Sequence, residues 1–388
     1  MGEPTVQLQR TILKGTVSYD NWHASGVGEP HVTYEYLLYS DASFNGEIAE
    51  GLGPYQFLNL CPLGEAKPGY ARPAVVLRAG FHIRAASPPE TEERKQRQAR
   101  YHGGDIIDEV VALASLRTGA RLKCGPKVRR FYPGDKQGRP LMESLRPEPY
   151  IPLKPLIRLR LLPYTASQHS LMSLHDMVLY PKLNPEDSIA LVRAARLYQE
   201  SLWVAESEPN LSWLWLVSAI ETVANRWRST QKPSLELCRT SRPDLFCYLD
   251  GLKVGGLATR VAKELAPLLG PTMKFISFLR TYHPDPPPVR PKKYGQVKWS
   301  KASLDDASSK IYDWRSRALH DGTPFPLTMC EPPLPDDNSG AFLEKPFGES
   351  DDWKKEDTPM LLHTFEYIVR HSLLKWWKGQ ADDQRMPV

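Results

Sequence analysis

Residues 313–322, Asp-Trp-Arg-Ser-Arg-Ala-Leu-His-Asp-Gly, place an arginine, a serine and a histidine within six positions near the end of an expected helix. Arg315 supplies a planar guanidinium that binds phosphate or carboxylate oxygens in pairs. His320 supplies an imidazole, whose charge changes near neutral pH, and Ser316 supplies a hydroxyl. Together these groups are suited to holding a phosphate and moving a proton beside it.

The helix that positions these residues is expected over 303–322, with Ser303 as its N-cap and Gly322 as its stop. Its core-facing stripe is formed by Leu304, Ala307, Ile311, Trp314 and Ala318. Arg315 lies about 50° from the centre of that stripe, at the margin of the core. A guanidinium there loses hydration and needs an anionic partner.

That partner is expected from a second helix, over 211–228. Its buried face is formed by Trp213, Leu216, Ile220, Val223 and Trp227. Glu221 lies at the margin of this face, just as Arg315 does on its own helix. We therefore expect a Glu221–Arg315 ion pair between two packed helices.

His320 points away from the apolar stripe, on the face that also carries Asp313 and Ser316. It lies in the last helical turn, where the helix dipole favours an imidazolium. The position suits acid–base catalysis, although a histidine before a terminal glycine is also common capping chemistry. Since Arg315 and His320 diverge by about 140° on an ideal helix, we expect them to share a substrate only at the helix end or across an interface with a second copy.

The chain has two halves of different character, which predicts an α+β fold. Residues 1–165 contain short aromatic and β-branched runs cut by turn residues, VTYEYLLYS, GPYQFLNL and PAVVLRAGFHIRA, and one helix over 104–119. From 185 the period is helical, with helices expected over 184–207, 209–229, 258–270, 271–283, 303–322 and 358–379. The predicted domains are a strand-rich mixed domain (1–165), a connector (166–184) and an α-helical domain (185–380) with a Pro-rich surface excursion (323–357).

Composition narrows the class of protein. The five cysteines are scattered, which fits neither a disulfide framework nor a zinc module, and reduced thiols in the cytoplasm fit best. The longest apolar stretch, 211–224, is too short to cross a bilayer, and no signal peptide is visible, so no membrane partner is expected. No Gly-rich phosphate loop, nucleophile elbow or paired metal ligands are present, and neither a metal nor a cofactor is expected. The net charge is +5, and the basic run 117–130 is either a solvated face or a nucleic-acid patch.

The Arg315-x4-His320 spacing, followed by Asp-Gly, resembles the signature of the HEPN superfamily (higher eukaryotes and prokaryotes nucleotide-binding), particularly its ApeA-like branch. The context is similar as well. A Trp-x-x-Leu-Val-x-Ala-Ile-Glu segment runs from Trp213 to Glu221 upstream, and a closing helix contains Arg370 and Leu373. The resemblance covers residues 185–378.

This resemblance implies an all-α bundle that forms a homodimer and cleaves RNA without a metal. Arg315, His320 and Ser316 would be its catalytic residues, with Glu221 and Asp313 supporting them. Such a ribonuclease would act as a toxin or antiphage-defence effector, with the N-terminal half sensing a regulatory protein or ligand. The alternative is a catalytically inactive HEPN-like bundle that binds nucleotide or RNA or serves as an assembly module.

Overall fold

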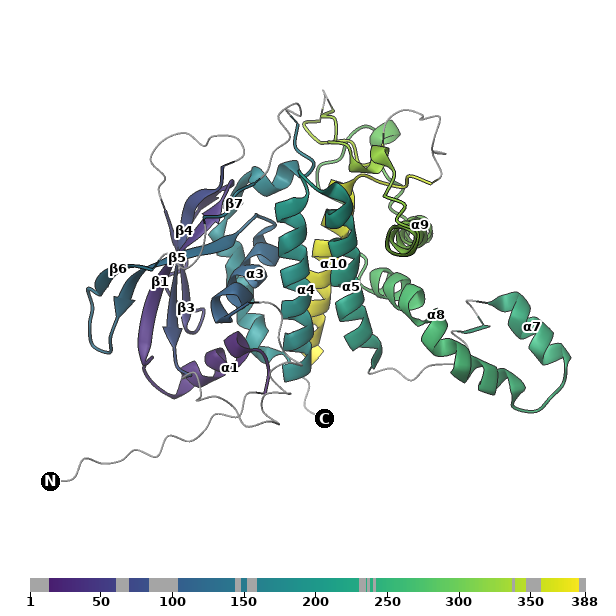
Figure 1. Ribbon diagram of the computed structural model, residues 1–388, viewed down its shortest axis with the longest axis horizontal. Coiled ribbons are helices and arrows are strands. Elements are labelled where there is room, and N and C mark those ends of the chain that lie inside the picture. Colours follow the sequence, from purple (N-terminus) through teal and green to yellow (C-terminus); the bar gives the residue numbers. More distant parts are fainter. Residues whose placement is uncertain are drawn as a thin grey trace. The chain divides into compact units, whose positions relative to one another are not determined.

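The computed structural model describes residues 14–60, 70–83, 104–143, 148–151, 159–229, 235, 238–239, 242–336, 339–346 and 357–383. The chain divides into two compact units (Figure 1). The first comprises 1–151, 165–196 and 380–388, and the second comprises 152–164 and 197–379. The first contains an antiparallel sheet and the second is helical, which confirms the predicted mixture of strand-rich and helical parts.

In the first unit the described strands are β1 (Val32–Ser40), β2 (Ser43–Asn45), β3 (Tyr55–Asn59), β4 (Arg72–Phe81), β5 (Lys123–Phe131), β6 (Arg139–Glu143) and β7 (Gln168–Ser170). Its helices are α1 (Val17–Ala24), α3 (Ile106–Thr118) and the 3₁₀ segments η1 (Ser25–Val27) and η3 (Leu171–Lys182); a further 3₁₀ segment, η2 (Pro163–Ala166), lies where the chain passes between the units. Within the described residues, antiparallel strands form a sheet of order β3-β4-β1-β5-β6, while β2 and β7 form a separate parallel pair.

The three strand-like runs of the N-terminal half correspond to β1, β3 and β4, so those predictions are confirmed. The helix expected over 104–119 is α3, which ends at Gly119 in the left-handed conformation (φ 77°). α3 is buried around almost its whole circumference rather than along one stripe, because it packs against both β5 and η3. Even its Glu109 is buried, and the carboxylate accepts hydrogen bonds from the backbone N–H groups of Val17 and Ser18 at the start of α1.

The sequence left two readings of the basic run 117–130 open, a solvated face and a nucleic-acid patch. In the structure, its residues differ in burial and in their partners. Arg121 is fully buried and forms an ion pair with Asp41 at 2.9 Å. Arg117 pairs with Asp176. The end of the run lies in β5, a strand that the sequence pattern did not reveal, where the side chains are partly exposed.

The helices of the second unit are α5 (Pro209–Ser229), α7 (Pro243–Gly251), α8 (Leu257–Thr281), α9 (Lys301–His320) and α10 (Leu362–Asp383, to residue 379). Helix α4 (Pro185–Val204) belongs to the first unit up to residue 196 and to the second from residue 197. Short 3₁₀ segments are η4 (Lys293–Gly295) and η5 (Leu327–Cys330). The helices predicted over 184–207, 209–229 and 358–379 are confirmed. The two short helices predicted over 258–270 and 271–283 are wrong, because α8 runs without interruption through Gly270 and Pro271.

The core of this unit is centred on Trp213 of α5. Its ring is stacked between Phe365 of α10 at 4.9 Å and Phe325 at 5.2 Å. Its indole N–H donates to the carbonyl of Met329. Phe325 and Met329 are both buried, so the Pro-rich stretch 323–357, expected as a surface excursion, also supplies part of the core.

Protonation of His363 is expected to destabilise the fold in acid. Burial lowers the pKa of this α10 side chain to about 4, although its ring N–H donates to the carbonyl of Leu343 at 2.7 Å. The unfolded chain takes up this proton near pH 6.5, whereas the folded chain does so only near pH 4. The free energy of unfolding should therefore fall by roughly 2–3 kcal/mol as pH drops between those values. Urea unfolding of wild type and His363→Gln at pH 7 and pH 4.5 measures this, and identical pH dependence in both would contradict it.

Among the described residues, no helix is both long enough and apolar enough to span a bilayer.

Candidate active site

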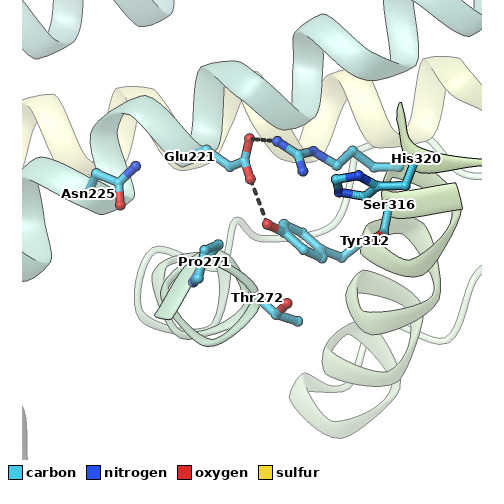
Figure 2. A pocket seen from close by; sticks show the side chains of 8 residues that line it. Glu221, Asn225, Pro271, Thr272, Tyr312, Ser316 and His320 are labelled. Atoms are coloured by element: carbon cyan, nitrogen blue, oxygen red, sulfur yellow. Dashed lines mark hydrogen bonds and ion pairs between the residues drawn. The ribbon is translucent and has the colours of Figure 1, made fainter. Parts of the chain in front are cut away.

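A pocket of about 440 Å³ lies in the second unit, where α5, α8 and α9 pack together. Its wall is formed by Glu221 and Asn225 of α5, Pro271 and Thr272 of α8, and Tyr312, Arg315, Ser316 and His320 of α9 (Figure 2). Four of the five residues selected from the sequence are in this set. The fifth, Asp313, is exposed and does not line the pocket.

Helix α9 contributes the chemically active wall. It begins at Lys301, after Ser300, whose hydroxyl accepts the N–H of Ser303. The prediction of Ser303 as the N-cap is therefore wrong, and the helix gains almost a full turn. It ends at His320, with Gly322 in the left-handed conformation (φ 68°), as expected for a glycine stop.

The spacing of four along α9 explains which side chains share the pocket. Tyr312, Ser316 and His320 follow one another along one face of the helix, as Figure 2 shows. Arg315 belongs to a different part of the circumference, but its guanidinium reaches back to 5.4 Å from the centre of the Tyr312 ring. Arg315 and His320 nevertheless line the same pocket of one chain, although they diverge by about 140° around an ideal helix.

Glu221 fixes the base of the pocket. One carboxylate oxygen accepts the hydroxyl of Tyr312 at 2.7 Å, and the other accepts an N–H of Arg315 at 2.8 Å (Figure 2). The predicted Glu221–Arg315 ion pair is therefore confirmed. The Arg315 and Glu221 side chains are 20% and 15% exposed, so water screens the pair only partly.

Glu221 and Tyr312 set the electrostatics around the Arg315 guanidinium. Glu221 binds one terminal nitrogen of Arg315, while the Nε–H of Arg315 is buried and has no hydrogen-bond partner. Burial and the adjacent Glu221 raise the pKa of Tyr312 well above its ordinary value of 10. Tyr312 consequently remains a neutral hydrogen-bond donor, and the carboxylate carries the pocket's fixed negative charge next to an equal positive charge.

The wall opposite His320 is polar but was not recognised from the sequence. Asn225 lies one turn after Glu221 on α5, and its side-chain carbonyl accepts a hydrogen bond from Lys274 of α8 at 3.0 Å. Thr272 lies beside Pro271 in the middle of α8. The sequence could have indicated Asn225 and Tyr312, because Asn225 lies four residues after Glu221 and Tyr312 lies four residues before Ser316, which places each pair on one helix face. The contribution of α8 was hidden because a Gly-Pro pair predicts a helix end.

No group of three or more histidine, cysteine, aspartate or glutamate side chains among the described residues is arranged to hold a metal ion. Comparison of the whole chain with family models, with curated proteins and with solved structures finds no match.

Proposed function

We propose that this chain is a metal-independent endoribonuclease of the HEPN type. The observation that carries the proposal is that Arg315, Ser316 and His320 line one pocket of a single chain, with Glu221 holding the guanidinium in place. The pocket therefore combines an anion-binding group, a hydroxyl and an imidazole, groups that suit the cleavage of a phosphodiester.

In the proposed reaction the ribose 2′-oxygen attacks the adjacent phosphorus. The O2′–P bond forms, the P–O5′ bond breaks, and a 2′,3′-cyclic phosphate and a 5′-hydroxyl result. One proton leaves the 2′-hydroxyl and one is delivered to the departing 5′-oxygen. His320, exposed at the end of α9, carries out one of these transfers, and solvent water at the same opening carries out the other.

Arg315 has the role of stabilising the charge on the phosphorus oxygens. The side chain is 20% exposed and Glu221 binds one of its terminal nitrogens, so the other terminal N–H groups can donate to a phosphate oxygen without displacing Glu221. Ser316, on the wall between Tyr312 and His320, supplies a further hydroxyl donor. Arg315 can therefore keep its ion pair with Glu221 while it also binds a phosphate.

The test is incubation of the purified full chain with single-stranded RNA in excess EDTA, with DNA of the same sequence as the control. We expect cleavage of RNA only, with 2′,3′-cyclic phosphate ends. RNA binding without cleavage would support the alternative, an inactive RNA-binding bundle, and a requirement for added metal would contradict the proposed chemistry.

Three further parts of the proposal concern the oligomeric state, the biological role and the regulation of the enzyme. We propose a homodimer, an effector role in toxicity or antiphage defence, and regulation through the N-terminal half. All three follow from the HEPN resemblance of the sequence. Light scattering on the purified protein, and growth of cells that express wild type or His320→Ala, address the first two directly.

A further inference from the structure

The β5–β6 hairpin of the first unit concentrates positive charge. Residues 127–139 contain five cations and one carboxylate, a net +4, whereas the whole chain carries +5. The hairpin forms the edge of the sheet and extends past the neighbouring strands (Figure 1). The projecting hairpin is therefore a strongly basic segment of the chain.

One of these cations, Arg129, is neutralised within the sheet. Arg78 and Arg129 share the carboxylate of Glu35, at 2.6 and 3.4 Å. Lys127 lies opposite Glu143 in the β5–β6 register. These three positions are compatible with an ordinary solvated sheet.

The tip of the hairpin is different. Arg130 and Arg139 lie directly opposite each other in the β5–β6 register, and no ion pair joins either one to a carboxylate among the described residues. Like charges in such a cross-strand pair destabilise a sheet. Lys136, in the connecting turn, is exposed and adds a third positive charge.

The tip is also preorganised and carries an aromatic ring. The carboxylate of Asp135 accepts the backbone N–H groups of Gln137 and Gly138, so the one acidic group of the turn holds its conformation. Tyr132 is 54% exposed. The guanidinium of Arg130 lies 5.5 Å from the centre of its ring and donates to its hydroxyl at 3.0 Å.

We propose that the tip of this hairpin, Arg130, Tyr132, Lys136 and Arg139, binds single-stranded polynucleotide. A repulsive arginine pair becomes favourable when phosphates lie between the two side chains, and an exposed aromatic ring gives an unpaired base a surface on which to stack. A duplex, whose bases are already stacked, does not use the ring in this way. That the polynucleotide is RNA rests on the proposed function, whereas the binding surface does not.

Fluorescence anisotropy with a labelled single-stranded RNA tests the surface, using His320→Ala as the parent so that the RNA stays intact. Adding Arg130→Glu, Lys136→Glu and Arg139→Glu should weaken binding by on the order of tenfold at 0.1 M salt. The slope of log Kd against log salt should fall by about 2, since each lost phosphate contact removes about 0.7. The matched control is Arg260→Glu, Lys263→Glu and Lys301→Glu, three exposed positions of the second unit, which should leave Kd within about twofold.

Single substitutions separate binding from folding. Tyr132→Ala should weaken RNA binding about fivefold or more, and Tyr132→Phe should not. Arg139→Glu should raise the melting temperature, because it removes the like-charge pair, while it weakens RNA binding. Equal losses in the hairpin and control triples, or unchanged Kd and salt slope in the hairpin triple, would overturn the proposal.

Failure of this proposal is distinguishable from failure of the proposed function. If the parent binds RNA through the hairpin but wild type cleaves nothing, the polynucleotide site stands and the nuclease fails. If wild type cleaves RNA and the hairpin triple binds and cleaves it unchanged, the nuclease stands and the hairpin site fails. DNA of the same sequence, measured in parallel, establishes whether the surface discriminates the ribose.

Discussion

Replacing His320 with alanine is expected to lower the rate of RNA cleavage by about 10²–10⁴-fold, the usual worth of a positioned acid–base group. The side chain is exposed at the last turn of α9, so its removal leaves the apolar stripe of the helix intact. The melting temperature should change by no more than about 1–2 °C, as for other exposed substitutions. Single-turnover cleavage of a fluorescent RNA measures the rate in EDTA.

The matched control is His175→Ala, an exposed histidine of η3 in the other unit. It should leave the cleavage rate unchanged, so that a loss confined to His320→Ala excludes a contaminating nuclease as the source of activity. If His320→Ala cleaves RNA as fast as wild type and His175→Ala, the imidazole has no role in the reaction.

Replacing Arg315 with alanine is the second large effect, an expected loss of about 10²–10³-fold in kcat, because one preorganised donor to the transition-state charge disappears. This substitution also affects the fold. Glu221 is only 15% exposed and would lose its cation, which should cost about 1–3 kcal/mol of unfolding free energy. Arg315→Lys keeps the charge but not the paired donors, and should fall between wild type and alanine.

A double substitution separates the catalytic effect from the structural one. In Arg315→Ala with Glu221→Gln, the unpaired carboxylate is gone, so most of the lost stability should return. Cleavage should stay as slow as in Arg315→Ala alone. If activity returns together with stability, Arg315 acts only by supporting the fold, and its proposed contact with phosphate is wrong.

The relation of sequence to structure differs between the two units. Apolar periodicity identified α4, α5 and α10 and the strands β1, β3 and β4, because those elements bury one face. The Glu221–Arg315 pair could be predicted because each residue lies at the margin of the apolar face of its amphipathic helix. The hairpin strands β5 and β6 escaped detection, since an edge rich in charge and containing Pro126 and Pro140 shows no alternation of apolar residues.

Tertiary packing accounts for the other differences. α8 continues through Gly270 and Pro271 because its flanks pack against α5 and α9, which offsets the hydrogen bond that proline removes. Residues of α8 therefore line the pocket at a point where the Gly270-Pro271 pair had predicted the end of a helix. Arg121, within a basic run, is buried against Asp41 from a distant strand end, and no local pattern distinguishes it from its exposed neighbours.

The most direct test of the central claim uses a DNA oligonucleotide that contains one ribonucleotide, incubated with wild type in EDTA. If Arg315 and His320 act together on a phosphodiester attacked by the neighbouring 2′-oxygen, cleavage occurs only on the 3′ side of the ribose. The products then carry a 2′,3′-cyclic phosphate and a 5′-hydroxyl. Cleavage at deoxyribose positions, or products with a 5′-phosphate, would contradict the account.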